Sequence, residues 1–317
     1  MESLSEQDKQ ILMALEYEFP LDKEPFKVIA QRFGLTEAEL LEKVKNYVHE
    51  GVVKRIGMYV SFRAKGMDGA LVAAQIPENK IEIFRKKALG IKEITHNYIR
   101  IHPKYNVWYV IKAENRKLLT DNIRSLMEEV GAEDYVILFS ERTIKLSVKY
   151  DVIRGISYSE PLVPRDEGRV DVDPQVLKVL SYPLPLVPRP FKEISQKLGM
   201  SEDDVLDIIR KLKERGAIRD YGATLNGEKV GITENGMLMV SSNNLEETCE
   251  SLASVRETTH VVLRSSDKPW DFLCYAMLHA KSKKLILDTA RKIVDQLDVK
   301  NYMILFSTEN LKPGIVI

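Results

Sequence analysis

Three segments of apolar residues at helical spacing open the chain, and a polar turn separates the second from the third. Gly34 is expected to end the second helix, and Thr36 to cap the third, three residues ahead of Glu39. Such helices form a helix-turn-helix, and V-V-K-R-I-G-M-Y-V-S after them suggests a wing. The predicted helices span residues 5–17, 25–33 and 36–50, and the wing spans 52–61.

After the wing, short strand-like segments alternate with amphipathic helical ones. Their order, β-α-β-β-α-β, is that of a ferredoxin-like domain. The expected elements are a strand at 70–76, a helix at 79–89, two strands within 95–111, a helix at 115–130 and a strand at 134–148.

The whole arrangement is then repeated. D-K-Q-I-L-M-A-L from Asp8 matches D-P-Q-V-L-K-V-L from Asp173, and the match runs without a gap to Gly57 over Gly222. The fold class is therefore α+β, a tandem duplication of a winged helix-turn-helix followed by a ferredoxin-like βαββαβ domain. The expected parts are 1–62, the first helix-turn-helix; 63–149, the first ferredoxin-like domain; 150–171, a linker without periodicity; 172–227, the second helix-turn-helix; and 228–317, the second ferredoxin-like domain.

Charge and cysteine content narrow the function classes. Among 317 residues, Lys plus Arg equals Asp plus Glu at 47 each, so an anionic ligand must be held by a local cluster. Cys249 and Cys274 are expected to be reduced, buried thiols of a cytosolic protein, and two cysteines cannot ligate a four-thiolate iron–sulfur cluster. Because no apolar run reaches the length of a membrane span and Met1-Glu2-Ser3-Leu4 starts no signal peptide, we expect a soluble, cytoplasmic protein without a membrane partner.

One strand of the first half carries side chains of unusual kinds at a spacing of two. In T-H-N-Y-I-R, alternate residues share a face, so His96, Tyr98 and Arg100 should point the same way. His260 and Arg264 fall at the matching positions of the second half. The repeat favours a functional face over a chance strand-edge arginine.

Two sets of motifs carry a resemblance to known families. A helix-turn-helix followed by a ferredoxin-like domain resembles the Lrp/AsnC regulators. H-N-Y-I-R with Y-N-V-W-Y in the first half resembles one subunit of siroheme decarboxylases. N-G-M-L-M with H-V-V-L-R and a Trp-bearing hairpin ending in M-L-H, in the second half, resembles the partner subunit. The chain thus looks like both subunits fused in tandem, a pseudo-heterodimer within one polypeptide.

The chain departs from the family pattern in places. Where the family often has a histidine after the wing, this chain has Phe62 and Gly227, and the tyrosine and asparagine of the first hairpin correspond to Phe272 and Leu273 in the second. We therefore expect the two halves to be unequal, with one active site centred on one of them.

The resemblance implies a non-oxidative carboxy-lyase. It would remove CO2 from the two ring acetates of siroheme at C12 and C18, giving 12,18-didecarboxysiroheme for haem or haem d1 synthesis. The conjugated macrocycle can share the charge left on the methylene carbon, so no added cofactor should be required. A transcription regulator with a ligand-sensing domain, for which haem is one candidate ligand, is the alternative, and a catalytically silent haem-binding protein is a third reading.

Each candidate site residue has a functional and a structural interpretation. The histidines would donate the proton or ligate the substrate iron, the protein holding no metal of its own, or would be core histidines. The arginines would bind carboxylates at the rim of the macrocycle. The aromatics would stack on it or simply pack, Arg55, Arg63 and Lys65 would otherwise form a solvated face, and His279 is expected at a surface strand end. The catalytic candidates are His96, His260 and Tyr98, and the substrate-binding candidates are Arg100, Arg264, Trp108, Trp270, Tyr105, Arg55 and Arg63.

DNA binding is not expected, despite the helix-turn-helix. The amino end of each recognition helix would approach phosphates, yet it reads T-E-A-E-L-L-E in the first copy and S-E-D-D-V-L-D in the second. We expect these domains to serve packing and dimer formation. A homodimer is possible if the edges of the ferredoxin-like sheets pair with a second molecule.

Overall fold

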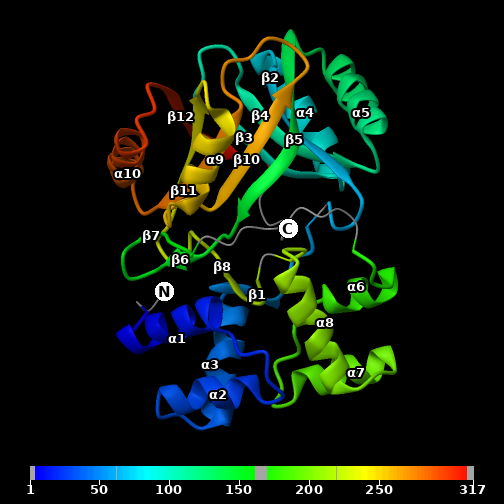
Figure 1. Ribbon diagram of the computed structural model, residues 1–317, viewed down its shortest axis with the longest axis vertical. Helices are drawn as coiled ribbons and strands as arrows, with labels where there is room; N and C mark the ends of the chain where they lie inside the picture. The colour runs from blue at the N-terminus through cyan, green and yellow to red at the C-terminus, as the bar shows by residue number, and fades with distance from the viewer. Residues whose placement is uncertain (1–3, 62, 161–169, 219, 313–317) are drawn as a thin grey trace.

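The helices that open the two halves lie together in one layer, and the strands that follow them form a second layer (Figure 1). The computed structural model describes residues 4–61, 63–160, 170–218 and 220–312. Ser5, Thr36 and Ser201 begin their helices with capping boxes, as the sequence predicts for Thr36. The elements of the helical layer are α1 (Glu6–Tyr17), α2 (Pro25–Arg32), α3 (Glu37–His49), β1 (Val53–Gly57), α6 (Pro174–Leu180), α7 (Pro190–Leu198), α8 (Glu202–Glu214) and β8 (Gly222–Leu225).

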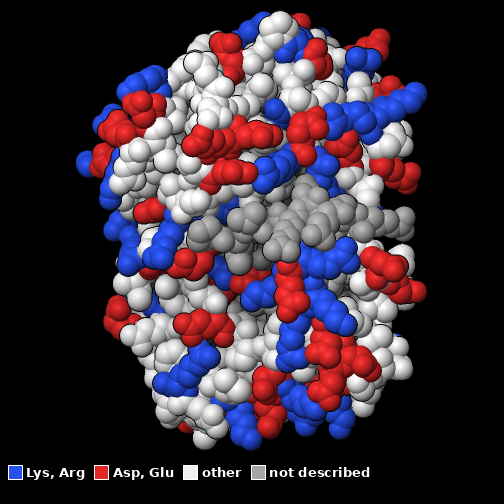
Figure 2. Space-filling view, in the orientation of Figure 1, with Lys and Arg blue, Asp and Glu red and all other residues white. Residues whose placement is uncertain are grey.

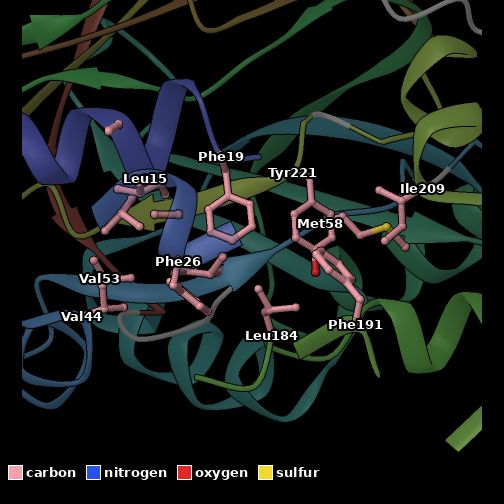
Figure 3. Packing of buried hydrophobic residues seen from close by; sticks show 14 of the residues in the cluster. Leu15, Phe19, Phe26, Val44, Val53, Met58, Leu184, Phe191, Ile209 and Tyr221 are labelled. Carbon is pink, nitrogen blue, oxygen red and sulfur yellow. The ribbon is translucent and has the colours of Figure 1, made fainter. Parts of the chain in front are cut away.

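The two helix-turn-helix units share one apolar core. Phe19 and Phe191 lie on opposite sides of Tyr221, with ring centroids 5.9 and 5.7 Å away, so an aromatic series crosses from one unit to the other (Figure 3). Where α1 approaches β8, a Cβ on Gly222 would lie 2.8 Å from the carbonyl oxygen of Leu15, which leaves room only for glycine. Burial of this core joins the units into one body.

The expectation of a wing within each half is wrong. Strand β1 pairs with β8 of the other half in a two-stranded antiparallel sheet, with Gly57 opposite Gly222. Each half contributes one strand, because an isolated strand would leave its backbone groups unpaired.

The second layer is a closed barrel of eight strands. The first four-stranded sheet has the order β5-β2-β4-β3 and the second the order β12-β9-β11-β10, as expected for ferredoxin-like domains. Edge strand β3 pairs with β12 of the other half, and β10 pairs with β5, so both sheets lose their free edges. The strands are β2 (Asp68–Gln75), β3 (Ile94–Arg100), β4 (Val107–Ala113), β5 (Asp134–Leu146), β9 (Glu234–Ser241), β10 (His260–Ser266), β11 (Cys274–Ala280) and β12 (Asn301–Asn310).

Helices cover the outside of the barrel and side chains fill its inside. Helices α4 (Ile81–Gly90), preceded by the 3-10 turn η1 (Glu78–Lys80), and α5 (Arg116–Glu129) cover the first sheet, and α9 (Leu245–Ser254) and α10 (Lys283–Gln296) cover the second (Figure 1). A separate apolar cluster from both sheets, with Leu138 and Leu305 among its members, lies inside. A homodimer remains a prediction, but it cannot use the expected sheet edges without opening the barrel.

Part of the expected linker belongs to the sheet. Strands β6 (Tyr150–Asp151) and β7 (Ile156–Ser157) pair with each other, and β7 pairs with β11 at Ala280. Residues 161–169 and Phe62 lie outside the described residues. At Gly227 a Cβ would lie 2.5 Å from the carbonyl oxygen of Ile232, so a histidine there would require a different turn.

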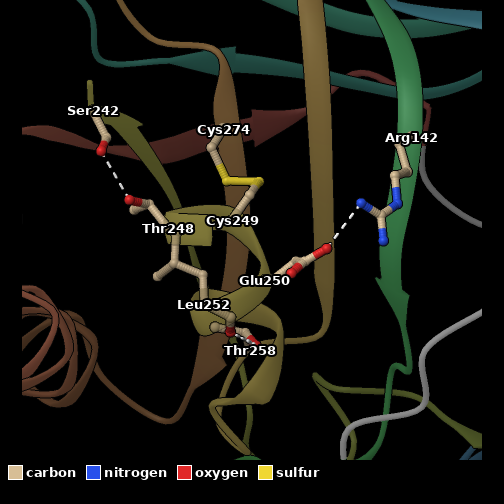
Figure 4. Close-up of a disulfide and its surroundings, with 8 residues drawn as sticks. All are labelled: Arg142, Ser242, Thr248, Cys249, Glu250, Leu252, Thr258 and Cys274. Carbon is tan, nitrogen blue, oxygen red and sulfur yellow. Dashed lines mark hydrogen bonds and ion pairs between the residues drawn. A yellow bond between two sulfur atoms is a disulfide. The ribbon is translucent and has the colours of Figure 1, made fainter. Parts of the chain in front are cut away.

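The expectation of reduced cysteines is also wrong. Cys249 of α9 and Cys274 of β11 form a disulfide with their Cα atoms 5.8 Å apart (Figure 4). Both residues are fully buried in the outer core of the second half. Packing of α9 against β11 brings them together, which no local sequence motif signals. Among the described residues, no helix is long and apolar enough to cross a membrane.

Candidate functional site

The pairing of β3 with β4 settles which side chains of the T-H-N-Y-I-R strand face the inside of the barrel. His96 lies opposite Val110 and Tyr98 opposite Trp108, and both partners pack with the inner cluster. Asn97 alternates with them and lies on the outward face. The predicted common face of His96, Tyr98 and Arg100 is therefore the inner wall of the barrel.

His96 and His260 face each other across the two halves. Their ring centroids lie 6.4 Å apart at an interplanar angle of 80°, and both side chains are half-buried. The Oγ1 atoms of Thr95 and Thr259 each lie 3.4 Å from Nδ1 of the following histidine. This repeated contact orients both rings in the same way, and the duplication has brought together two residues 164 positions apart.

Arg100 crosses from the first half to the second. Its Nη1 donates to the carbonyl oxygen of Leu305 at 3.2 Å and to Oδ1 of Asn235 at 3.1 Å. The guanidinium lies over the ring of Tyr98, 5.0 Å from its centroid, and the residue is only 6% exposed. The amide of Asn235 donates in turn to Oγ of Ser307 at 2.8 Å, which fixes the acceptor for Arg100.

Arg264 makes the equivalent crossing from the second half to the first. Its Nη1 donates to the carbonyl oxygen of Leu138 at 3.2 Å and to Oγ of Ser140 at 2.9 Å. Its guanidinium lies 5.1 Å from the centroid of Tyr275. The Nε atom of Arg264 is buried and has no hydrogen-bond partner within the part of the chain that the structure describes.

Neither guanidinium is neutralised by the protein around it. Burial lowers the pKa of Arg100 and of Arg264 to about 10 each. Among the described residues, neither arginine forms an ion pair with a carboxylate. Buried cations held only by neutral acceptors are costly, and an anionic ligand would offset that cost.

The surroundings of Arg100 include a histidine that the sequence placed wrongly. His279 was expected at a surface strand end, but it lies opposite Asn235 on the inner wall. Its desolvation and the charge of Arg100 lower the pKa of His279 to about 4. Its ring packs against Tyr150, 5.7 Å between centroids. His279 is therefore neutral at ordinary pH and available as a hydrogen-bond acceptor.

Tyr98, the third catalytic candidate, lies against Arg100, and its catalytic role stays a prediction. Its ring supports Arg100, and burial raises the pKa of its hydroxyl above the usual range. The hydroxyl beside Nδ1 of His96 is that of Thr95.

The remaining aromatic candidates form a separate cluster where the two hairpins meet. Trp270 of the second half packs against Trp108 and Tyr105 of the first, with centroids 6.3 and 5.7 Å away, and stacks on His102. Trp108 is 1% exposed, and its Nε1 donates to the carbonyl oxygen of Tyr105 at 2.9 Å. These contacts fit the packing interpretation and hold the hairpins together. Stacking on a macrocycle stays a prediction.

Arg63 and Arg55 separate in space. Arg63 donates to the carbonyl oxygen of Ser140, the residue whose hydroxyl accepts from Arg264. Arg55 donates to the carbonyl oxygen of Ser181 at 2.6 Å and lies over the ring of Tyr59, within the helical layer. The structure thus places Arg63 beside Arg264 and Arg55 apart from it. Lys65 is exposed, as the structural interpretation held.

The described part of the helical layer uses the start of α8 for contacts between the two units. The acidic start of α8 faces the other unit, where Asp203 pairs with Lys23 at 2.9 Å and Arg210 donates to the carbonyl oxygen of Leu21. Figure 2 shows Lys and Arg interspersed with Asp and Glu over the helical layer on one face. These observations support packing, not groove insertion, as the role of the layer.

Several inner-wall residues were missed from the sequence. The duplication offered a signal for four of them. Thr95 and Thr259 occupy matched positions before the histidines, and Ser140 and Ser307 occupy matched positions in the last strands. Asn235 lay within the N-G-M motif. Among the described residues, no group of three or more His, Cys, Asp or Glu could hold a metal ion.

Comparisons with known proteins agree with this geometry. The model of an AsnC-like ligand binding domain matches residues 64–145 and 229–312, and that of a siroheme decarboxylase NirDL-like helix-turn-helix domain matches 8–53 and 173–219. The siroheme decarboxylase of Hydrogenobacter thermophilus is 30% identical over 96% of this chain and 92% of its own length. A solved siroheme decarboxylase NirDL, in co-complex with an iron-uroporphyrin III analogue, superposes with a TM-score of 0.67 at 28% identity, covering 97% of this chain and 92% of that one.

Shorter relatives match part of the chain. The alpha and beta subunits of the siroheme decarboxylase of Oleidesulfovibrio alaskensis are 32% and 31% identical over 41% and 39% of this chain, and 79% and 80% of their own lengths. The duplicated chain is thus similar to proteins that occur elsewhere as two separate subunits.

Proposed function

Because this chain belongs to the siroheme decarboxylase family, with the counterparts of both subunits in one polypeptide, we propose that it removes CO2 from the C12 and C18 acetates of siroheme. The product is 12,18-didecarboxysiroheme, an intermediate for haem or haem d1. The chain is accordingly a carboxy-lyase.

One observation carries the assignment of the site. Two arginines, the buried Arg100 and the half-buried Arg264, lie on the inner wall that also carries the facing pair His96 and His260, and neither has a carboxylate partner among the described residues. Siroheme is a flat macrocycle fringed with carboxylates. Two guanidiniums at symmetry-related positions fit two such groups, each through a pair of parallel hydrogen bonds.

The arginines are best assigned to carboxylates that do not react. A guanidinium on the departing carboxylate would stabilise its negative charge in the ground state and oppose the loss of CO2. Bound to other carboxylates, it fixes the macrocycle so that one acetate at a time faces the histidines. Arg63, which shares Ser140 with Arg264, is a further candidate for these carboxylates.

The chemistry then requires a single proton. The bond between the acetate methylene and its carboxylate breaks, CO2 leaves, and the electron pair on the methylene carbon is shared with the conjugated macrocycle. Protonation of that carbon gives a methyl group. An imidazole can donate such a proton and regain one from water near neutral pH, which suits His96 or His260, the other being available to the substrate iron. We propose that no further cofactor takes part.

The test is incubation of the purified protein with reduced siroheme in the absence of oxygen, followed by mass spectrometry of the pigment. Wild type should lose two CO2 units in sequence. His96→Ala and His260→Ala should be compared with it, and the variant that removes the proton donor should be slower by roughly 10²- to 10⁴-fold. Siroheme that stays bound but unchanged in the wild type would refute the assignment.

A further inference from the structure

Two buried lysines occupy matched positions at the ends of the last strands of the two halves. Lys145 follows Phe139-Ser140 by the same number of residues as Lys312 follows Phe306-Ser307. Lys145 is fully buried and Lys312 is 4% exposed. Neither forms an ion pair with a carboxylate among the described residues, so both are held by other contacts.

Lys312 of the second half reaches into the first. Its Nζ donates to the carbonyl oxygens of Ala88, Ile91 and Ile94, at 3.0, 2.7 and 2.7 Å. These carbonyls belong to the end of α4 and the turn into β3. His96 follows Ile94 by two residues, so the hydrogen bonds of Lys312 constrain the backbone that leads to His96.

Lys145 of the first half makes the reciprocal contact with the second. Its Nζ donates to the carbonyl oxygen of Val255 at 2.7 Å, with Oγ1 of Thr258 at 3.4 Å. Thr258 donates to the carbonyl oxygen of Leu252 at 2.9 Å, the position that corresponds to Ala88. His260 follows Thr258 by two residues. The two halves therefore hold each other's histidine turn with the same kind of side chain.

Stability alone does not account for a lysine at either position. An ammonium group buried among carbonyl oxygens loses its hydration, and burial lowers the pKa of Lys145 to about 8 and that of Lys312 below its usual range. The helix carboxyl end favours a cation only modestly. An apolar side chain of similar size would often be as stable, whereas three converging hydrogen bonds fix a turn in one geometry.

We propose that Lys145 and Lys312 are crossed positioning residues, each fixing the histidine of the opposite half against the substrate: Lys312 acts through His96 and Lys145 through His260. The inference rests on the proposed function and deepens it. It gives a reason for the two halves to act together, since a lysine of each half hydrogen-bonds to the histidine turn of the other.

A double-mutant cycle distinguishes positioning from general stabilisation. Lys312→Met and Lys145→Met are each placed in wild type, His96→Ala and His260→Ala. Binding of ferric uroporphyrin III is followed by its Soret absorbance, and thermal unfolding is recorded beside it. Lys149→Met is the matched control, because Lys149 lies nearby, is also buried, and pairs with Asp220 instead of carbonyls.

Crossed positioning predicts a selective pattern. Lys312→Met should weaken binding and slow siroheme turnover roughly tenfold or more in wild type and in His260→Ala, and should add nothing in His96→Ala. Lys145→Met should show the opposite selectivity. Lys149→Met should have the same effect on binding in both histidine backgrounds. Lys312→Gln, whose amide can reach some of the same carbonyls, should recover part of the loss, and it replaces Lys312→Met in the cycle if that variant does not fold.

Equal effects of a lysine variant in both histidine backgrounds would overturn the inference and leave the lysines a purely structural role. The proposed function fails in a different way, through a wild-type protein that binds ferric uroporphyrin III but leaves siroheme unchanged. The two failures are therefore separable in one set of samples.

Discussion

The two halves of the barrel carry identical side chains at some inner-wall positions and different ones between them. Histidine, arginine and the preceding threonine recur in both halves, and each arginine reaches the last strand of the other half. Around them, Asn235 and His279 of the second half correspond to Gly69 and Lys112 of the first. The repeated residues depend on contacts that cross between halves.

The side chains that differ gather around Arg100. Asn235 accepts a hydrogen bond from Arg100, the charge of Arg100 lowers the pKa of His279, and the guanidinium lies over the ring of Tyr98. In the second half, the counterpart of Tyr98 is Val262. The residues that pair the halves recur in both, whereas the residues around Arg100 differ from those around Arg264. We therefore expect two carboxylates of one asymmetric macrocycle to meet two different environments.

The largest expected difference between the halves is in stability, because the disulfide occurs in the second half alone, where Arg85 and Val107 are the counterparts in the first. Closing a sequence separation of 25 residues should stabilise the protein by about 3 kcal/mol. Urea unfolding with and without a thiol reductant measures this. Reductant should shift the wild-type transition and leave a Cys249→Ala, Cys274→Val protein unmoved. A wild-type midpoint insensitive to reductant would show that the bond is absent.

His279 should give the second half an acid sensitivity that the first lacks. Its pKa of about 4 lies below the ordinary 6.5, so the unfolded chain takes up a proton at a higher pH than the folded one. The stability it contributes is complete above pH 6.5 and is lost as pH falls through 4, a change of about 3 kcal/mol.

The free energy of unfolding of wild type and of His279→Asn, measured over this pH range, separates the contribution of His279 from that of the titrating carboxylates. Arg100→Gln should give an intermediate profile, because the charge of Arg100 is the second cause of the lowered pKa, after burial. Parallel profiles of wild type and His279→Asn would rule out a buried neutral histidine.

The arginines should differ in which product they control. Arg100→Lys and Arg264→Lys keep the charge but lose the planar guanidinium that can make two parallel hydrogen bonds. Each should raise KM for siroheme roughly tenfold or more. Asn235→Ala should act like a weaker Arg100 variant, and Ser140→Ala like a weaker Arg264 variant. The ratio of the two mono-decarboxylated intermediates, separated by chromatography, reports the distinction. Identical ratios in all four variants would mean that the halves are equivalent.

The smallest effect concerns the hairpins. Asp134 binds Lys104 and Tyr105 of the first hairpin and Lys268 of the second, and the hydrogen bonds from these residues lower its pKa although burial opposes this. Because the lysines are exposed, Asp134→Asn should cost about 1 kcal/mol or less in thermal unfolding at pH 7. Asn301→Ala, at the matched position of the second half, should cost nothing measurable. If both variants lost the same free energy of unfolding, the hairpin contact of Asp134 would not distinguish the two halves.

Local pattern was sufficient for much of the fold. The capping box at Thr36, the glycine at the end of α2 and the β-α-β-β-α-β order all depend on neighbouring residues, and the structure confirms them. The common face of His96, Tyr98 and Arg100 follows from strand alternation alone and is confirmed as well.

The errors share a different cause. The shared wing, the disulfide, the sheet strands in the linker and the inner-wall position of His279 all arise from contacts between segments far apart in the chain. Pairing of β3 with β12 and of β10 with β5 decides what lies inside the barrel, and a single sequence contains no local signal for it. The duplication itself was the one long-range clue.

The most direct test of the account is a crystal structure of this protein with ferric uroporphyrin III bound. We predict carboxylates of the ligand within hydrogen-bonding distance of Arg100 and Arg264, and the ring between the two halves with His96 or His260 facing it. A ligand bound elsewhere, with both arginines still donating only to Leu305, Asn235, Leu138 and Ser140, would contradict the site proposed here.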